Sequence, residues 1–182
     1  MSFPGTLDHL VYAVPDLAAA VPDFAERTGV APSQGGRHLV GSANALVALT
    51  VNGERAPHYL EIVGPDPERA DPGPVRVFGL ADLEQPHLAT FAVRVDEGLP
   101  SAVERARAVG HDPGDVEPWS RATPEDDVLH WHLAKREPET YPEPAALAPA
   151  LSALGVDLDL TEGSNPLLEA VLRSPKGEFV LR

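Results

Sequence analysis

The sequence contains no cysteine, and its basic residues are half as numerous as its acidic ones. Without cysteine there is no disulfide, no thiolate metal ligand and no cysteine nucleophile. Fourteen Lys and Arg against 28 Asp and Glu give a net charge of −14, which argues against nucleic-acid and anionic membrane partners. The first residues, "MSFPGTLDHL", lack a signal-like charged and apolar pattern, and no apolar run reaches membrane-spanning length. We therefore expect a cytoplasmic protein.

Proline and glycine are abundant instead, with 20 and 15 residues spread through loops. Such stretches, for example "VGPDPERADPGP", are typical of rigid turns rather than of a disordered tract. Hydrophobic residues make up 43% of the 182 residues, which is sufficient for a globular core. These proportions favour one domain, or two small fused halves.

The two halves of the chain repeat one pattern. A strand over 7–14 is followed by a helix that Asp16 caps and Gly29 ends, and a strand over 88–95 is followed by a helix that ends at Gly110. Gly110 follows Gly29 by 81 residues (110 − 29), and Pro113 follows Pro32 by the same offset. The offset places Thr90 where the first copy has His9, and it predicts two copies of one supersecondary unit.

Further strands follow each helix. In the first copy, "NALVALTV" and "HYLEIVG" flank Asn52-Gly53, a strong hairpin signal. In the second copy "VLHWHLA" is the clearest strand. The remaining chain predicts a helix that ends at Gly155 and a terminal hairpin that turns at 175–177.

Six stretches are spread over nearly the whole length of the chain: "LDHLVYAVPDLAAAV", "GGRHLVGSANALVAL", "YLEIVGPDP", "LATFAVRV", "WSRATPEDDVLHWHLA" and "LEAVLRSPKGEFVL". In these residues the sequence resembles the glyoxalase-like domain proteins of the vicinal oxygen chelate superfamily. The resemblance implies an α+β fold with paired βαβββ modules that form a curved mixed sheet around a cleft. It implies a single domain over 1–182, with modules at about 5–65 and 86–135 and a C-terminal helix and hairpin at about 143–182.

In that superfamily the cleft often holds a divalent metal on one ligand from each of four strands, and the metal-bound substrate is isomerised, cleaved or oxygenated. Other members bind drugs without a metal. This sequence departs from the pattern, because Thr90 stands where a second histidine is usual and Leu181 where many relatives have a glutamate. The short link "KREPETYPEP" also indicates that a strand of the second module is missing.

His9 and Glu61 are the main site candidates, since each is a single polar group in an apolar strand. An unpaired buried carboxylate is costly, so such residues need a partner. Imidazole and carboxylate together suit zinc, iron, manganese or nickel. We expect His9 and Glu61 as metal ligands, with Glu61, or else a cavity histidine, as the catalytic proton carrier. Alternatively the two side chains hydrogen-bond each other, or His9 caps a neighbouring backbone group.

Six further residues are candidates for substrate binding: Arg37, His38, Asn44, Arg121, His130 and His132. His130 and His132 share one strand face and are cavity-facing, or else form an exposed polar face over a buried Trp131. Arg37 and His38 follow two glycines and contact an anionic substrate, or simply belong to a turn.

The other two substrate-binding candidates also have structural alternatives. Asn44 orients a turn or touches the ligand. Arg121 clamps a carboxylate or forms a surface salt bridge with Asp126 or Asp127.

Three functions remain open at this level. The first is a metal-dependent lyase, isomerase or dioxygenase acting on a small oxygenated molecule. The second is a metal-free protein that binds a drug or metabolite without catalysis. The third is an inactive relative that forms a homodimer through an open sheet edge.

Overall fold

The computed structural model describes residues 5–71, 73–95, 98–123, 127–135, 144–156, 160–161, 163–164 and 167–182. Backbone contacts group the chain into two compact units. The larger comprises His9–Ala92, Ser120–Leu129 and Leu168–Arg182, and the smaller comprises Met1–Asp8, Val93–Trp119 and His130–Leu167.

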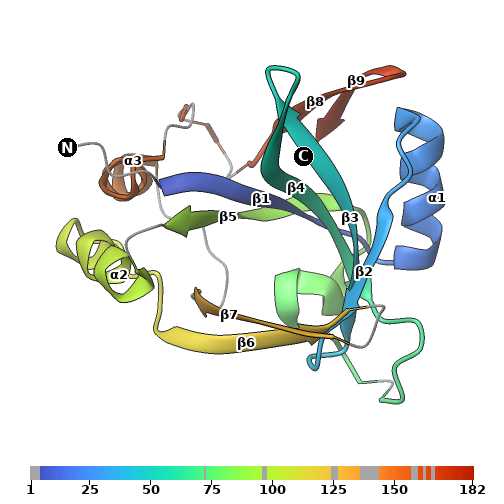
Figure 1. Ribbon diagram of the computed structural model, residues 1–182, viewed down its shortest axis with the longest axis horizontal. Helices are drawn as coiled ribbons and strands as arrows, with labels where there is room; N and C mark the ends of the chain where they lie inside the picture. The colour runs from blue at the N-terminus through green and yellow to red at the C-terminus, as the bar shows by residue number, and fades with distance from the viewer. Residues whose placement is uncertain are drawn as a thin grey trace. The chain divides into compact units, whose positions relative to one another are not determined.

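A mixed sheet is the framework of the larger unit, and every strand of the sheet contributes residues to that unit. In spatial order the strands are β5 (His87–Val95), β1 (Gly5–Ala13), β4 (Glu54–Pro65), β3 (Ser42–Val51), β2 (Ser33–Arg37), β6 (Val116–Ala122) and β7 (Val128–Ala134). The β1–β4 pair is parallel, whereas β4–β3, β3–β2 and β2–β6 are antiparallel. Strands β3 and β4 curve along their length (Figure 1). The predicted α+β class with a curved mixed sheet is confirmed.

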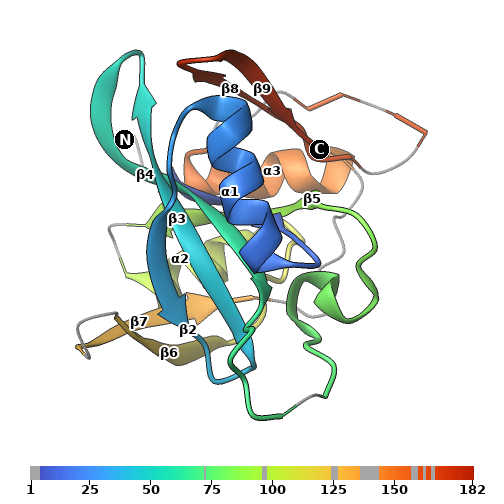
Figure 2. The same cartoon turned by 90° about the vertical axis from the view of Figure 1, so that its right-hand side faces the viewer.

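Helix α1 (Leu17–Thr28) covers one face of this sheet (Figure 2). The Asp16 side chain accepts a hydrogen bond from the Ala19 N–H at 3.0 Å, and Gly29 ends the helix with φ of 76°, a left-handed conformation that glycine adopts without a Cβ clash. Both predicted caps are therefore confirmed. Leu17 and Phe24 are buried, on the sheet face that also bears Tyr12 and Ile62.

The opposite face of β1 and β4 is also covered. Val11, Ala13 and Val63 belong to an apolar cluster on this face. Its other buried members are Val75, Val77 and Leu80, in and next to the 3-10 helix η1 (Val77–Asp82), and Ala89 of β5. Because successive strand residues point to opposite faces, β1 and β4 carry buried side chains on both. These two strands are the core of the unit.

Two hairpins agree with the turn signals in the sequence. The β3–β4 hairpin turns at Asn52 and Gly53, which both have positive φ (53° and 83°), as a type I′ turn requires. Near the C-terminus, β8 (Ala170–Ser174) and β9 (Gly177–Leu181) form a separate two-stranded sheet. Phe179 meets Phe24 edge-on, with ring centroids 5.2 Å apart, so this hairpin packs on α1 (Figure 2).

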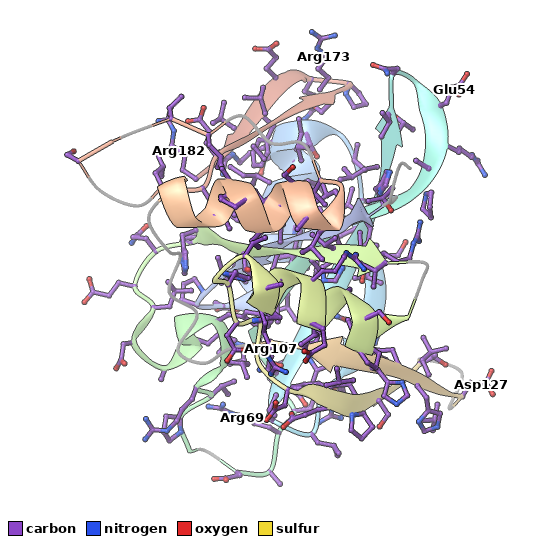
Figure 3. All side chains as sticks on the ribbon, turned by 90° about the vertical axis from the view of Figure 1, so that its left-hand side faces the viewer. Glu54, Arg69, Arg107, Asp127, Arg173 and Arg182 are labelled. Carbon is purple, nitrogen blue, oxygen red and sulfur yellow. The ribbon has the colours of Figure 1, made fainter. Side chains whose placement is uncertain are left out.

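In the smaller unit, α2 (Leu99–Ala108) lies beside α3 (Pro144–Leu154). Ala102, Val103 and Ala106 of α2 are buried, and the Arg105 guanidinium donates to the Ala153 carbonyl at 3.1 Å. On the exposed side of α2, Arg107 (Figure 3) pairs with Glu104, Asp112 and Asp115. In an acidic chain a single arginine thus compensates several carboxylates.

The first module reads β1–α1–β2–β3–β4, the predicted βαβββ order. In the second module β5 and α2 are followed, within the described residues, by β6 and β7. No helix in the described part of the chain is long and apolar enough to cross a membrane.

Candidate functional site

His9 and Glu61 come together on one face of the β1–β4 pair. In the parallel register His9 lies opposite Tyr59 and Val11 opposite Glu61, so alternation places all four side chains on the same face. The distance from His9 Nε2 to Glu61 Oε2 is 3.6 Å. The two side chains are 18% and 11% exposed, so the pair is largely enclosed and still accessible to solvent.

Tyr59 holds the His9 ring from the neighbouring strand. The two rings are stacked, with centroids 4.5 Å apart and an interplanar angle of 16°. Stacking of this kind restricts the rotation of the imidazole, which keeps Nε2 on the side of Glu61. Strand alternation puts Tyr59 on the Glu61 side of β4, but the stack depends on the register between β1 and β4, which no local pattern gives.

Asn44 of β3 is the second partner of Glu61. Its amide Nδ2 donates to Glu61 Oε1 at 2.5 Å, and its Oδ1 accepts from the Gly36 backbone N–H at 2.7 Å. Asn44 and Glu61 are both buried, at 7% and 8% exposure. A chain of polar contacts therefore runs from a backbone amide to the carboxylate and on towards His9.

The two glycines before Arg37 lie within a strand. They belong to β2, and the register passes from Gln34↔Ala45 to Arg37↔Ala43, so β2 has one more residue than β3 over this stretch. Gly35 and Gly36 form a β-bulge, which turns the Gly36 N–H towards Asn44. Two adjacent glycines inside a strand are themselves a signal for a bulge.

Arg37 and His38 follow the bulge and have partners of their own. Arg37 binds Asp66 at 2.6 Å and Glu68 at 3.0 Å, and Asp66 is buried. The His38 ring is hydrogen-bonded to the Ser42 hydroxyl at 2.8 Å, across the tight turn between β2 and β3. His38 thus belongs to the turn that the alternative foresaw. Substrate contact by either residue stays a prediction.

The remaining candidates are more exposed or lie outside the description. His130 and His132 of β7 are both exposed, with Trp131 half-buried between them. The backbone of Arg121 belongs to β6. Its side chain falls outside the description, and so does Asp126. Thr90 is half-buried on β5 and Leu181 is buried on β9, and neither is a strong metal donor.

A pocket of about 220 Å³ lies on the other face of β1 and β4, beneath α1. Tyr12 and Ile62 line it from the sheet, and Phe24, Arg27 and Phe179 from α1 and β9. Since Tyr12 and Ile62 alternate with His9 and Glu61 along their strands, this pocket does not contain the polar pair. The cleft expected around His9 and Glu61 stays a prediction.

The described residues do not form a complete metal site. Two ligands bound to one tetrahedral ion lie about 3.4 Å apart, so the 3.6 Å separation of His9 and Glu61 suits one edge of such a site. Catalytic metal sites, however, use about three protein ligands. No group of three His, Asp or Glu side chains within the described ranges is arranged to hold an ion. Among the described residues, the donors at this place are thus fewer than a catalytic metal site uses.

Taken together, a βαβββ module, a mixed sheet and one enclosed His–Glu–Asn cluster define an α+β protein with a small polar site on the sheet of its first module. The chain belongs to the glyoxalase-like domain family, whose model matches residues 7–174. The predicted resemblance is confirmed. No curated protein matches the chain.

Two solved structures with related chain paths are both methylmalonyl-CoA epimerases. The enzyme from Mycobacterium tuberculosis has 21% identity and a TM-score of 0.45, over 85% of this chain and 85% of its own. A variant of the Streptomyces coelicolor enzyme, in complex with 2-nitronate-propionyl-CoA, has 20% identity and a TM-score of 0.43, over 72% of this chain and 97% of its own.

Proposed function

We propose that the chain binds a small oxygenated molecule at Glu61 and His9, and that Glu61 acts there as a proton acceptor without a resident metal. The observation that supports this most is the enclosed carboxylate, which has one oxygen bonded to Asn44 and the other facing His9. A carboxylate held in an apolar strand face is costly, and folding alone does not require it.

The geometry suits removal of a proton from carbon next to a carbonyl group. Glu61 Oε2 takes the proton as the C–H bond breaks, and the electron pair moves to the carbonyl oxygen to give an enolate. His9 Nε2 lies 3.6 Å from Glu61 Oε2 and is placed to donate a hydrogen bond to the enolate oxygen of the substrate. Return of the proton from Glu61 to carbon restores the carboxylate, so the step is balanced without a co-reactant.

Deuterium exchange into hydroxyacetone, a small hydroxy ketone, tests this activity. In D₂O the protein is expected to accelerate loss of the hydroxyacetone C–H signals in proton NMR. Glu61→Gln is expected to reduce the acceleration by about 10²- to 10⁴-fold, the usual contribution of a positioned base. Glu54→Gln, an exposed carboxylate on the same strand (Figure 3), is the matched control and leaves the rate unchanged.

The outcomes separate catalysis from binding. Exchange by the wild type at the rate of Glu61→Gln contradicts a catalytic base. If hydroxyacetone nevertheless shifts the NMR signals of His9 and Glu61, the non-catalytic binding function is favoured instead. If the protein shows neither accelerated exchange nor NMR shifts, the proposal is wrong for this class of ligand.

Metal addition tests the metal-free part. Isothermal titration with zinc, manganese and nickel is expected to show no stoichiometric tight binding, because two protein donors are too few. One tightly bound ion per chain, lost in His9→Ala, would overturn this part and favour a metal-dependent lyase, isomerase or dioxygenase.

A further inference from the structure

We propose that Asn44 is a positioning residue that fixes the Glu61 carboxylate, and that the glycine bulge of β2 holds Asn44 in the orientation this needs. The catalytic consequence rests on the proposed function, whereas the contact itself does not. Asn44, Gly36 and Glu61 come from three adjacent strands, β3, β2 and β4, so the arrangement spans the centre of the first module.

The orientation of the Asn44 amide follows from its neighbours. A backbone N–H only donates, so the amide atom 2.7 Å from the Gly36 nitrogen must be the oxygen. The amide nitrogen then faces Glu61 Oε1, an acceptor. The Gly36 N–H thereby excludes the flipped amide, which would point an oxygen at the carboxylate.

Because of this contact, each of the two carboxylate oxygens of Glu61 has a different neighbour. Oε1 accepts from Asn44, and Oε2 lies 3.6 Å from His9 Nε2. An unfixed glutamate side chain has several rotatable bonds, and ordering it costs conformational free energy with each substrate bound. Because the bond from Asn44 orders the carboxylate in the folded protein, Oε2 is already placed when a substrate arrives.

A close approach to Asn44 explains the glycine at position 35. A Cβ on Gly35 would lie 1.9 Å from Asn44 Oδ1 and 2.8 Å from the Asn44 carbonyl oxygen, closer than atoms can approach. Glycine weakens a strand interior, and its presence often marks a close approach of this kind. The Gly35 position therefore leaves room for the Asn44 side chain, and Gly36 supplies the donor.

Asn44→Asp keeps the size of the side chain and the bond from Gly36, but it replaces the donor by a second carboxylate that faces Glu61. Asn44→Ala removes both contacts, and Thr50→Ala, exposed on the same strand, is the control. In the hydroxyacetone exchange assay, kcat is expected to fall by about 10- to 100-fold in Asn44→Asp and Asn44→Ala, the usual weight of a hydrogen bond to a charged group. KM is expected to stay within about twofold, because Asn44 does not touch the substrate.

An NMR measurement tests the contact independently of activity. The Asn44 side-chain NH₂ signals, assigned by their loss in Asn44→Asp, are expected to exchange slowly with solvent in the wild type. In Glu61→Ala that protection is expected to be lost, because the acceptor is gone. Unchanged protection in Glu61→Ala overturns the inference whether or not the protein is active.

The two measurements distinguish the possible failures. A wild type that does not accelerate exchange fails the proposed function, while the NMR result still decides whether Asn44 holds Glu61. A rise in KM with unchanged kcat makes Asn44 a substrate-binding residue instead. Full activity in Asn44→Ala shows that Glu61 does not need this contact, and it also overturns the inference.

Discussion

Strands β1 and β7 both carry histidine among apolar residues, yet their histidines lie in different environments. His9 of β1 is stacked on Tyr59 and lies 3.6 Å from Glu61, whereas His130 and His132 of β7 are exposed. β1 lies between β5 and β4 in the sheet, and β7 is the last strand in the order. A similar sequence pattern thus produces a paired, enclosed side chain in a central strand and an exposed one in a terminal strand.

The largest effect that would sharpen this comparison is on stability. Leu60, on β4 beside β1, is fully buried, and Leu129 of β7 is 46% exposed. Leu60→Ala is expected to lower the free energy of unfolding by about 2–5 kcal/mol through the cavity it leaves. Leu129→Ala is expected to change it by less than about 0.5 kcal/mol. Urea denaturation of both variants tests this, and equal losses would remove the contrast between the two regions.

A smaller contrast is expected between the histidines themselves. His9→Ala removes the stack on Tyr59, and aromatic pairs of this kind contribute about 0.5–1.5 kcal/mol. His132→Ala, at an exposed position, is expected to have an effect near zero on the free energy of unfolding. A large loss in His132→Ala would mean that β7 is covered by a partner in solution.

The smallest expected effect is a pH dependence that comes from neither strand. Burial lowers the pKa of His87, at the start of β5, below its ordinary value of 6.5. The folded state then binds fewer protons than the unfolded state, so stability is lost as the pH falls through and below 6.5. His87→Gln is expected to reduce this loss in chemical denaturation at pH 5 to 8. Equal losses in the wild type and in His87→Gln would contradict this assignment.

Much of the fold could be predicted from the sequence, because the signals are local. The caps at Asp16 and Gly29 and the hairpin at Asn52-Gly53 each depend on the conformational range or hydrogen-bonding group of one residue. The internal repeat likewise predicted the order of elements in both modules. The Gly35-Gly36 bulge was not predicted, because glycine permits turns and bulges equally and only pairing with β3 distinguishes them.

The candidate site was predictable only in part. Alternation along β1 and β4 assigned His9 and Glu61 each to a strand face, but the Tyr59 stack and the Asn44 bond require the register between three strands. In the sequence, Arg37 is a candidate to bind an anionic substrate. In the structure its guanidinium is bound to Asp66 and Glu68. A charge in the sequence gives no information on which opposite charge will reach it.

The sequence by itself indicated the ends of α1, the Asn52-Gly53 turn and several of the strands, since backbone torsions and capping hydrogen bonds act over a few residues. Only the tertiary structure decided that one oxygen of Glu61 accepts a hydrogen bond from Asn44 and that the other faces His9. That choice depends on which strands pair and in what register, and it is made by the burial of whole strand faces rather than by any single residue.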